Sequence, residues 1–249
     1  MKRTVLISTL FLCCCASLNI PPQFVYKEIE TSYFKLASWQ KITNPTAPYK
    51  FYIEGDGAAF RASGKVSSNP TPRSRLLREI AFGDEHENVI YLARPCQYVK
   101  DNRCQAKYWS NARFSSQVVQ SEYEAIKQIS TENPLVLVGF SGGAQIAGLI
   151  AVKYHDLQIN KLVTIAGNLD VQAWVEYHSL PKLNLSDDLS RYREEYAQFN
   201  QVHYLGKKDK NIVPSISQRF IENHSSIRLV ENASHNQGWK QVYEQIRQE

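Results

Sequence analysis

Residues 135–143 read LVLVGFSGG, and no other stretch restricts the fold of this chain as strongly. The continuous apolar run is typical of a strand covered on both faces of a parallel sheet. It passes directly into a G-x-S-x-G motif, and residues with helical spacing follow. A sharp strand-to-helix turn tolerates little side-chain bulk, and it exposes the hydroxyl of Ser141 at the start of the helix. Ser141 is therefore a candidate nucleophile, and the alternative is a glycine-rich turn with an idle serine.

The remaining chain repeats the alternation of apolar strands and helical patterns, without an internal repeat or a linker. This pattern predicts one α/β domain over residues 24–249, with a mostly parallel central sheet, an N-terminal antiparallel hairpin and helices on both faces. In such sheets ligands gather beyond the carboxyl ends of the strands. Strands are expected at 24–30, 32–39, 51–54, 88–93, 135–140, 161–166, 201–205 and 226–230, and helices at 113–129, 143–154, 186–199, 215–222 and 236–248.

Composition excludes several classes of protein. Hydrophobic residues make up 43% of the 249 positions and charged residues 21%, which is unlike a disordered, collagen-like or multi-pass membrane protein. A domain of this length buries enough surface to fold without a metal. The net charge of +5 comes from interleaved basic and acidic residues, which is a poor basis for nucleic-acid binding.

The N-terminus has the layout of a secretory signal peptide. Residues 1–17 read MKRTVLISTLFLCCCAS, with two basic residues, an apolar stretch and a run of small residues. The apolar stretch is far shorter than the ~20 residues of a membrane-spanning helix. Export is expected, to a periplasmic, secreted or lipid-anchored location. Two outcomes stay open: a lipid anchor at Cys13, which would be the only membrane contact, or cleavage near Ala16.

Cys96 and Cys104 are separated by a short polar segment, 97–103. After export they would enter an oxidising compartment, where a disulfide is stable. Closing so short a loop contributes about 2–3 kcal/mol on the chain-entropy model. A metal site would need more ligands at close spacing, so we expect a disulfide and no metal.

A serine nucleophile requires a base, and the base requires an orienting acid. His203 lies inside the strand-like segment VHYLG, where alternation predicts a buried structural side chain. His235 lies in ENASHNQGW, a polar turn after the last strand, which reaches the same edge of the sheet as Ser141. We therefore expect His235 to be the base.

Two carboxylates compete for the role of the acid. Asp209 lies in GKKDKNIVP, the loop after the penultimate strand, with Pro214 suited to the first turn of a helix. Asp170 follows the preceding strand in AGNLD and can also reach the histidine. Asp209 is preferred, and Asp170 remains the alternative.

An oxyanion needs two preorganised backbone N–H donors. The residue after the nucleophile, Gly142, is expected to supply one. The turn after the strand at 51–54, which reads EGDGAAF, is expected to supply the other from Asp56 or Gly57. Taken alone, GDG is only a turn signal, and its position relative to Ser141 gives it weight.

With these residues assembled, the chain resembles the α/β-hydrolase superfamily over residues 24–249. More narrowly, it is similar to bacterial exported or lipoprotein-type α/β hydrolases. The resemblance implies a triad of Ser141, Asp209 and His235. Glu54 departs from the pattern, because many relatives carry histidine before the glycine. This departure concerns the segment that is expected to supply the second oxyanion donor. The matching segments are YIEGDG at 52–57, ARPCQY at 93–98, FSGG at 140–143, AGNLD at 166–170 and His235 with Trp239.

The expected function is that of an exported serine hydrolase cleaving an ester or related acyl substrate through an acyl-enzyme on Ser141. Peptidase, thioesterase and acyltransferase activities stay open, since a triad fixes reaction type and not substrate. The partner is a small-molecule or lipid acyl substrate, and no cofactor is implied. The alternative is a non-catalytic binding or structural lipoprotein. Residues 168–189 form either a small cap over the site or an ordinary helix with a surface loop.

Overall fold

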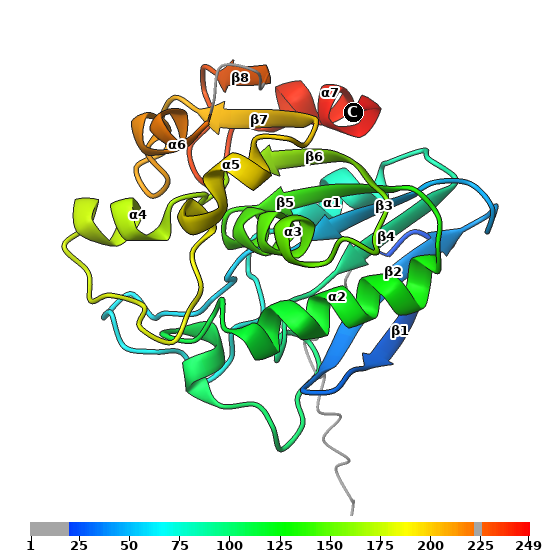
Figure 1. Cartoon of the computed structure of the whole chain (residues 1–249), viewed down its shortest axis with the longest axis horizontal. Helices are drawn as coiled ribbons and strands as arrows, with labels where there is room; N and C mark the ends of the chain where they lie inside the picture. The colour runs from blue at the N-terminus through cyan, green and yellow to red at the C-terminus, as the bar shows by residue number, and fades with distance from the viewer. Residues whose placement is uncertain (1–19, 222–225) are drawn as a thin grey trace, which may run out of the picture.

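In the computed structural model of the chain, residues 20–221 and 226–249 are described, so the expected signal peptide, 1–17, lies outside the described residues. One sheet of eight strands runs through the molecule in the order β1-β2-β4-β3-β5-β6-β7-β8 (Figure 1). β1 and β2 are antiparallel, β2 is antiparallel to β4, and every other pair is parallel. The predicted sheet is thereby confirmed. Its strands are β1 (Val25–Glu30), β2 (Lys35–Ile42), β3 (Tyr49–Ile53), β4 (Asn88–Leu92), β5 (Leu135–Phe140), β6 (Ile159–Ile165), β7 (Gln201–Gly206) and β8 (Ser226–Val230).

Two hydrophobic cores lie on opposite faces of this sheet. α2 (Ser116–Ser130) and α3 (Gly142–Lys153) cover one face, and α1 (Leu76–Phe82) and α7 (Tyr243–Gln248) cover the other (Figure 1). Along β5, Leu135 and Leu137 enter the first core, while Val138 and Phe140 enter the second. Because successive side chains of a strand point to opposite faces, a strand with a core on each side is apolar throughout.

Several helical segments differ from expectation. The helix expected at 186–199 is reduced to η2 (Leu189–Tyr192) and α5 (Arg193–Tyr196). It starts at Leu189, where the carboxylate of Asp188 caps the first turn by accepting from the N–H of Ser190, and it is interrupted at Tyr192, whose φ of −121° is not helical. The helix expected at 236–248 begins only at η3 (Lys240–Val242), since Gly238, with φ of 84°, continues the preceding turn. α1 was not anticipated.

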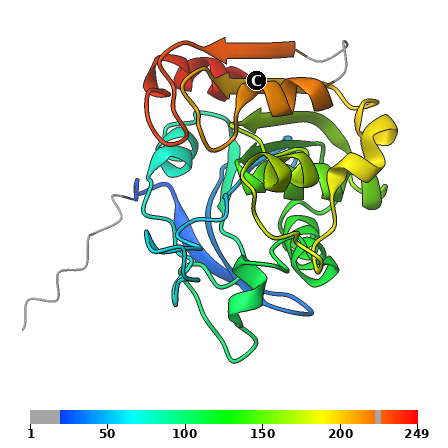
Figure 2. The same cartoon turned by 90° about the vertical axis from the view of Figure 1, so that its left-hand side faces the viewer.

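The carboxyl ends of β3, β5, β6, β7 and β8 share one edge of the sheet. α4 (Val171–Tyr177) lies beyond this edge (Figure 1), and in Figure 2 the edge faces the viewer. α6 (Pro214–Phe220) begins with the expected proline, and η1 (Ala106–Trp109) completes the helical elements. No helix within the two described ranges is long and apolar enough to cross a membrane.

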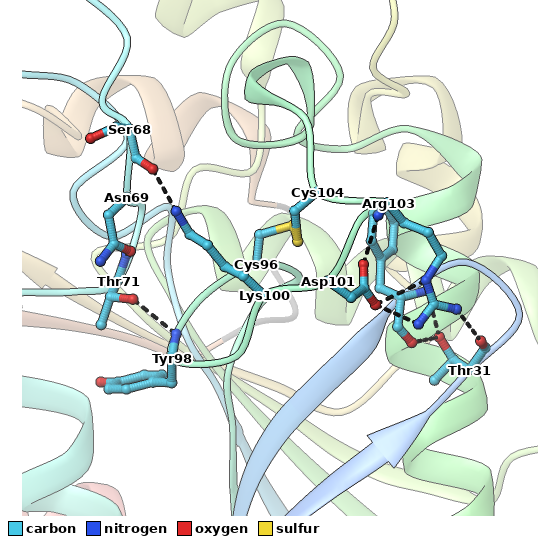
Figure 3. The surroundings of a disulfide bond; sticks show 11 residues. Thr31, Ser68, Asn69, Thr71, Cys96, Tyr98, Lys100, Asp101, Arg103 and Cys104 are labelled. Atoms are coloured by element: carbon cyan, nitrogen blue, oxygen red, sulfur yellow. Dashed lines mark hydrogen bonds and ion pairs between the residues drawn. A yellow bond between two sulfur atoms is a disulfide. The ribbon is translucent and has the colours of Figure 1, made fainter.

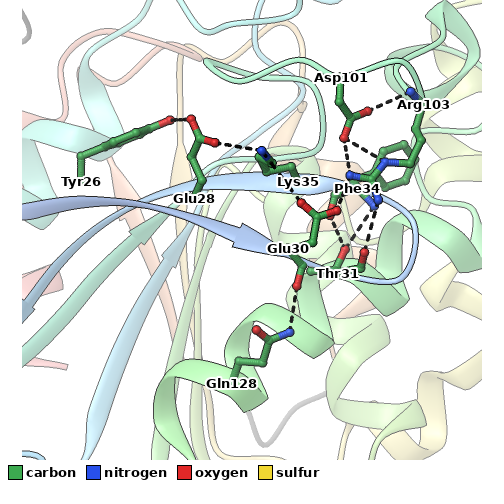
Figure 4. Close-up of polar contacts among 9 residues, drawn as sticks. All are labelled: Tyr26, Glu28, Glu30, Thr31, Phe34, Lys35, Asp101, Arg103 and Gln128. Carbon is green, nitrogen blue, oxygen red and sulfur yellow. Dashed lines mark hydrogen bonds and ion pairs between the residues drawn. The ribbon is translucent and has the colours of Figure 1, made fainter.

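A disulfide joins Cys96 to Cys104, with their Cα atoms 5.7 Å apart (Figure 3). On one side, the N–H of Tyr98 donates to the hydroxyl of Thr71 at 2.8 Å. On the other side, Arg103 forms ion pairs with Asp101 and with Glu30 at the end of β1 (Figure 4). The bridged loop is therefore fastened both to the segment after β3 and to the first hairpin.

Candidate active site

Ser141 occupies the turn between β5 and α3 with backbone angles φ 52° and ψ −119°, a conformation that L-residues rarely adopt. Its N–H donates to the carbonyl of Ile165 at 3.0 Å, and its carbonyl accepts from the N–H of Asn168 at 3.0 Å. A Cβ atom on Gly143 would lie 2.2 Å from the carbonyl oxygen of Ile53, so only glycine allows α3 to start this close to β3. The G-x-S-x-G spacing thus has a steric cause in this fold.

His235 faces Ser141 from the turn after β8. Its Nε2 lies 3.1 Å from Ser141 Oγ, and its Nδ1 lies 2.8 Å from Asp209 Oδ2. The ring packs beside Phe140, with centroids 5.2 Å apart. Buried Trp239 holds the turn by donating from its indole N–H to the carbonyl of Ser234 at 2.7 Å. This bond gives Trp239, four residues after His235, a structural role in the turn that carries the histidine.

Asp209 follows β7, and its carboxylate is fully buried. One oxygen, Oδ1, accepts from the backbone N–H groups of Asn211 and Ile212 at 2.8 and 2.9 Å, which leaves Oδ2 to accept from His235. The loops after β7 and β8 are joined by the N–H of Lys208 donating to the carbonyl of Ala233 at 2.9 Å. A carboxylate held on its remaining side fixes both the tautomer and the orientation of the imidazole.

The two alternatives from the sequence have other partners. His203 is fully buried in β7, where Nδ1 lies 2.8 Å from the Thr164 hydroxyl and Nε2 lies 2.9 Å from the side-chain oxygen of Gln201. Burial lowers the pKa of His203 to about 3, so it stays neutral. Asp170 caps α4 by accepting from the N–H of Ala173 at 2.8 Å, and burial raises its pKa. The structure therefore brings Asp209, and not Asp170, to His235.

The turn after β3 lies directly over Ser141. A Cβ on Gly55 would be 3.2 Å from the Cβ of Ser141, whereas one on Gly57 would meet the carbonyl of Pro70 at 2.1 Å. Between them, Asp56 points its carboxylate at Gly142. Within the described ranges, the backbone N–H groups of Asp56 and Gly142 donate to no protein acceptor. Both N–H groups are therefore free to bind a substrate oxygen.

Glu54, where the resemblance led us to expect a histidine, shapes this turn from inside. Its carboxyl accepts from the N–H of Gly55 at 2.8 Å and from the hydroxyl of Tyr91. Burial raises the pKa of Glu54. A glutamate at this position is compatible with the turn, because its side chain bonds to the loop itself.

The segment ARPCQY packs behind the same turn. The side-chain amide of Gln97 donates to the carbonyl of Gly55 at 2.9 Å, and Arg94 reaches the carboxylate of Asp56 at 3.5 Å. Arg113, from the segment before α2, forms a second ion pair with Asp56 at 2.7 Å. Sequence reasoning assigned no role to either arginine. The only signal was their position, Arg94 directly after the strand expected at 88–93 and Arg113 at the start of the helix expected at 113–129.

A cavity of about 1020 Å³ opens above Ser141 and His235. Residues 180–184 and Trp174 form one wall, so the segment 168–189 includes a short helix and a loop that border the site. No group of three His, Cys, Asp or Glu side chains among the described residues is arranged to hold a metal ion. The apolar part of the lining comprises Ala58, Ala59, Phe60, Pro72, Phe140, Trp174, Leu180, Pro181 and Leu183.

The sheet order and the hydrogen-bonded serine, histidine and aspartate define an α/β hydrolase of the serine type. Residues 85–239 match the family described as Serine hydrolase (FSH1). This match spans more than half of the chain, and the chain belongs to that serine hydrolase family. No curated protein matches the chain in sequence at a significant level.

Solved structures share the fold at low sequence identity. Est1E from Butyrivibrio proteoclasticus has a TM-score of 0.63 and 11% identity, and the match covers 90% of this chain and 96% of that one. An esterase from Pyrococcus furiosus has a TM-score of 0.60 and 12% identity, with coverages of 90% and 88%. A putative hydrolase from Agrobacterium vitis has a TM-score of 0.59 and 13% identity, with coverages of 90% and 97%.

Proposed function

We propose that the protein is an exported serine hydrolase that cleaves an ester or a related acyl substrate through an acyl-enzyme on Ser141. The observation that carries this proposal is the continuous hydrogen-bonded chain from Ser141 through His235 to Asp209 at the floor of a cavity. One of the structural neighbours is named as an esterase, and this supports the choice of an acyl substrate. Acyl transfer needs a nucleophile, a base and an oriented acid, and all three lie in contact here.

In the acylation step, the Ser141 oxygen attacks the substrate carbonyl while His235 Nε2 takes the hydroxyl proton. Asp209 keeps the proton of the imidazole on Nδ1, so that Nε2 is free to accept. The resulting imidazolium then protonates the leaving group as the tetrahedral intermediate collapses. In deacylation, a water molecule repeats the same sequence and releases the acid and the free serine.

The oxyanion of each tetrahedral intermediate would bind the backbone N–H groups of Gly142 and Asp56. Gly142 is the first residue of α3, where the helix dipole adds to the attraction for negative charge. Asp56 is preferred over Gly57 because Asp56 lies against Gly142, the first donor, whereas the space beside the Cα atom of Gly57 is filled by Pro70. Donors of this kind are each worth roughly 10²–10³ in turnover in serine hydrolases.

A fluorophosphonate probe tests the proposal. The wild-type protein should be labelled covalently, whereas Ser141→Ala should not be labelled. Ser115→Ala is a matched control, because this serine is buried and lies away from the cavity lining. If the wild type fails both to label and to hydrolyse simple aryl esters, the alternative of a non-catalytic binding lipoprotein replaces the hydrolase.

Export belongs to the same proposal. It is supported by the signal-like residues 1–17 and by the Cys96–Cys104 disulfide, a bond that persists in oxidising compartments. Mass spectrometry of the N-terminus of protein isolated from a bacterial envelope decides between the two maturation routes. A diacylglyceryl group on a cysteine of 13–15 would show a lipid anchor, and an unmodified N-terminus near residue 17 would show simple cleavage. A retained Met1 would contradict export.

A further inference from the structure

A carboxylate lies beside the proposed oxyanion site. A Cβ atom on Gly142 would be only 2.3 Å from Oδ1 of Asp56, so this carboxylate lies against the backbone of Gly142. Asp56 is also proposed to donate its own backbone N–H to the oxyanion. A negative charge against the backbone of a proposed oxyanion donor opposes the second negative charge that develops during the reaction, and the effect grows in a partly buried site. The position is therefore unfavourable for catalysis unless the charge of Asp56 is neutralised.

Two arginines surround that carboxylate, one on each oxygen. Arg113 Nη1 lies 2.7 Å from Oδ2 and Arg94 Nη1 lies 3.5 Å from Oδ1, and both guanidinium groups are nearly buried. Arg94 also contacts buried Glu122, but burial raises the pKa of Glu122 to about 8. At neutral pH Glu122 is therefore largely protonated, and the charge of Arg94 is left to Asp56.

Arg113 also connects the oxyanion turn to the opposite wall of the cavity. Its guanidinium lies between the rings of Phe60 and Trp174, 5.3 and 5.8 Å from their centroids. Its Nε donates to the carbonyl of Ser110 at 2.7 Å, so three sides of the group are engaged. A planar guanidinium can stack and form ion pairs at the same time, which a lysine ammonium cannot do.

Trp174 continues the connection to the acid. Its indole N–H donates to the carbonyl of Asn211 at 3.0 Å, and the N–H of Asn211 donates to Asp209 at 2.8 Å. One arginine thus touches the turn that carries the oxyanion donor and the helix that is bonded to the loop of the triad acid.

We propose that Arg113 is a positioning residue for the hydrolysis reaction: it neutralises Asp56 beside the oxyanion site and fixes the turn that carries the second oxyanion donor. The inference rests on the proposed function. Arg94 supports the same carboxylate from the interior of the protein. The arrangement allows a turn to be anchored through a charged side chain without presenting that charge to the oxyanion.

A double-mutant cycle between Asp56 and Arg113 tests the inference. Arg113→Gln leaves the carboxylate of Asp56 insufficiently neutralised, so kcat for a neutral aryl ester should fall about 10- to 100-fold, with KM changed less than about threefold. Asp56→Asn removes the charge but also weakens the anchor, and it should cost about three- to tenfold. In the double variant, the uncharged amide at position 56 no longer repels the oxyanion, so kcat should recover at least about fivefold relative to Arg113→Gln alone.

Recovery by a second substitution is the outcome that a merely structural role of Arg113 would not produce. Arg247→Gln is the matched control, since Arg247 pairs with Glu244 in α7 and does not line the cavity, and it should change kcat less than about twofold. If Arg113→Gln does not fold, Arg113→Lys replaces it. Lysine should then cost less activity in the Asp56→Asn background than in the wild type.

Two results would overturn the inference while leaving the proposed function in place. One is a double variant as slow as, or slower than, Arg113→Gln although the wild type is active and labelled by the probe. The other is an unchanged kcat in Arg113→Gln. By contrast, a wild type that neither labels nor hydrolyses esters contradicts the proposed function itself.

Discussion

Asp209 and Asp170 are carboxylates that follow neighbouring strands, yet their surroundings give them different tasks. Asp209 contacts His235, whereas Asp170 caps α4. Replacing Asp209 with Asn should lower turnover by on the order of 10⁴, because the imidazole loses the partner that fixes its tautomer. Replacing Asp170 with Asn should cost about 1 kcal/mol of stability or less and leave turnover nearly unchanged.

Hydrolysis of a simple aryl ester, measured beside thermal unfolding, separates the two effects. The triad assignment is wrong if Asp170→Asn abolishes turnover while Asp209→Asn only lowers the melting temperature. If neither substitution affects turnover, His235 is not the base.

The buried histidine of β7, His203, leads to a prediction about how stability depends on pH. Its folded pKa of about 3 lies below the ordinary value of 6.5, so the unfolded chain binds a proton that the folded chain does not bind between these two values. The contribution of His203 to the free energy of unfolding should therefore be fully present above about pH 6.5. It should fall as the pH is lowered toward 3, by up to about 1.4 kcal/mol per pH unit.

The comparison with His203→Gln isolates this contribution, because glutamine does not titrate. Urea unfolding at several pH values should show that the wild type loses stability faster than the variant below pH 6.5. Parallel curves for the two proteins would show that His203 does not account for the slope.

At the scale of elements, the strands were predictable and several helices were not. A buried strand such as β5 is apolar along its whole length, because the two cores lie on its two faces. α1 has only seven residues, its N-cap residue Arg75 makes no side-chain capping bond, and Gly83 at its C-terminal end is not in αL. Its buried residues, Leu76, Leu77, Ile80 and Ala81, do carry a helical spacing that longer windows obscure.

The candidate site shows the same division. Ser141, Asp209 and His235 could be predicted because each follows a recognisable strand, and the ends of parallel strands meet at one edge. Asp56 with Arg113 could not be predicted as a pair. These residues are 57 positions apart, and their ion pair depends on how the segment before α2 packs against the turn after β3.

The bridged loop 96–104 contains Gln97, which bonds to the turn over Ser141, and opening its disulfide should affect both stability and turnover. The double variant Cys96→Ser with Cys104→Ser should lose about 2–3 kcal/mol of stability. Turnover should fall about two- to tenfold, since Gln97, inside the loop, holds the carbonyl of Gly55. Thermal unfolding and ester hydrolysis with and without dithiothreitol measure both effects. An equal response of the wild type and the double variant to dithiothreitol would contradict this role.

At the scale of the whole molecule, charge is unevenly distributed around the cavity. Residues 57–78 contain five basic residues and no acidic residue. Arg73 and Lys182 line the cavity, and within the described ranges neither forms an ion pair. Interactions between exposed charges weaken as salt shortens the screening length.

We therefore expect kcat/KM for an ester with a carboxylate on its leaving group to fall several-fold between about 0.02 and 0.5 M salt. The methyl ester of the same compound should change less than about twofold. Arg73→Gln combined with Lys182→Gln should remove most of the difference, and Lys27→Gln, on the distant strand β1, should not. An identical salt response of the two esters would refute the prediction.

The order of the strands also determines which part of the site is least protected against local opening. Ser141 follows β5, which has a partner strand on each side. His235 follows β8, which among the described residues pairs with β7 alone and has mostly exposed side chains. Edge elements with few buried contacts open at lower free energy than central ones. Native-state hydrogen exchange should then show amides of β8 exchanging well before those of β5. Rising denaturant should abolish turnover before the global unfolding transition, because the base departs while the nucleophile is still in place.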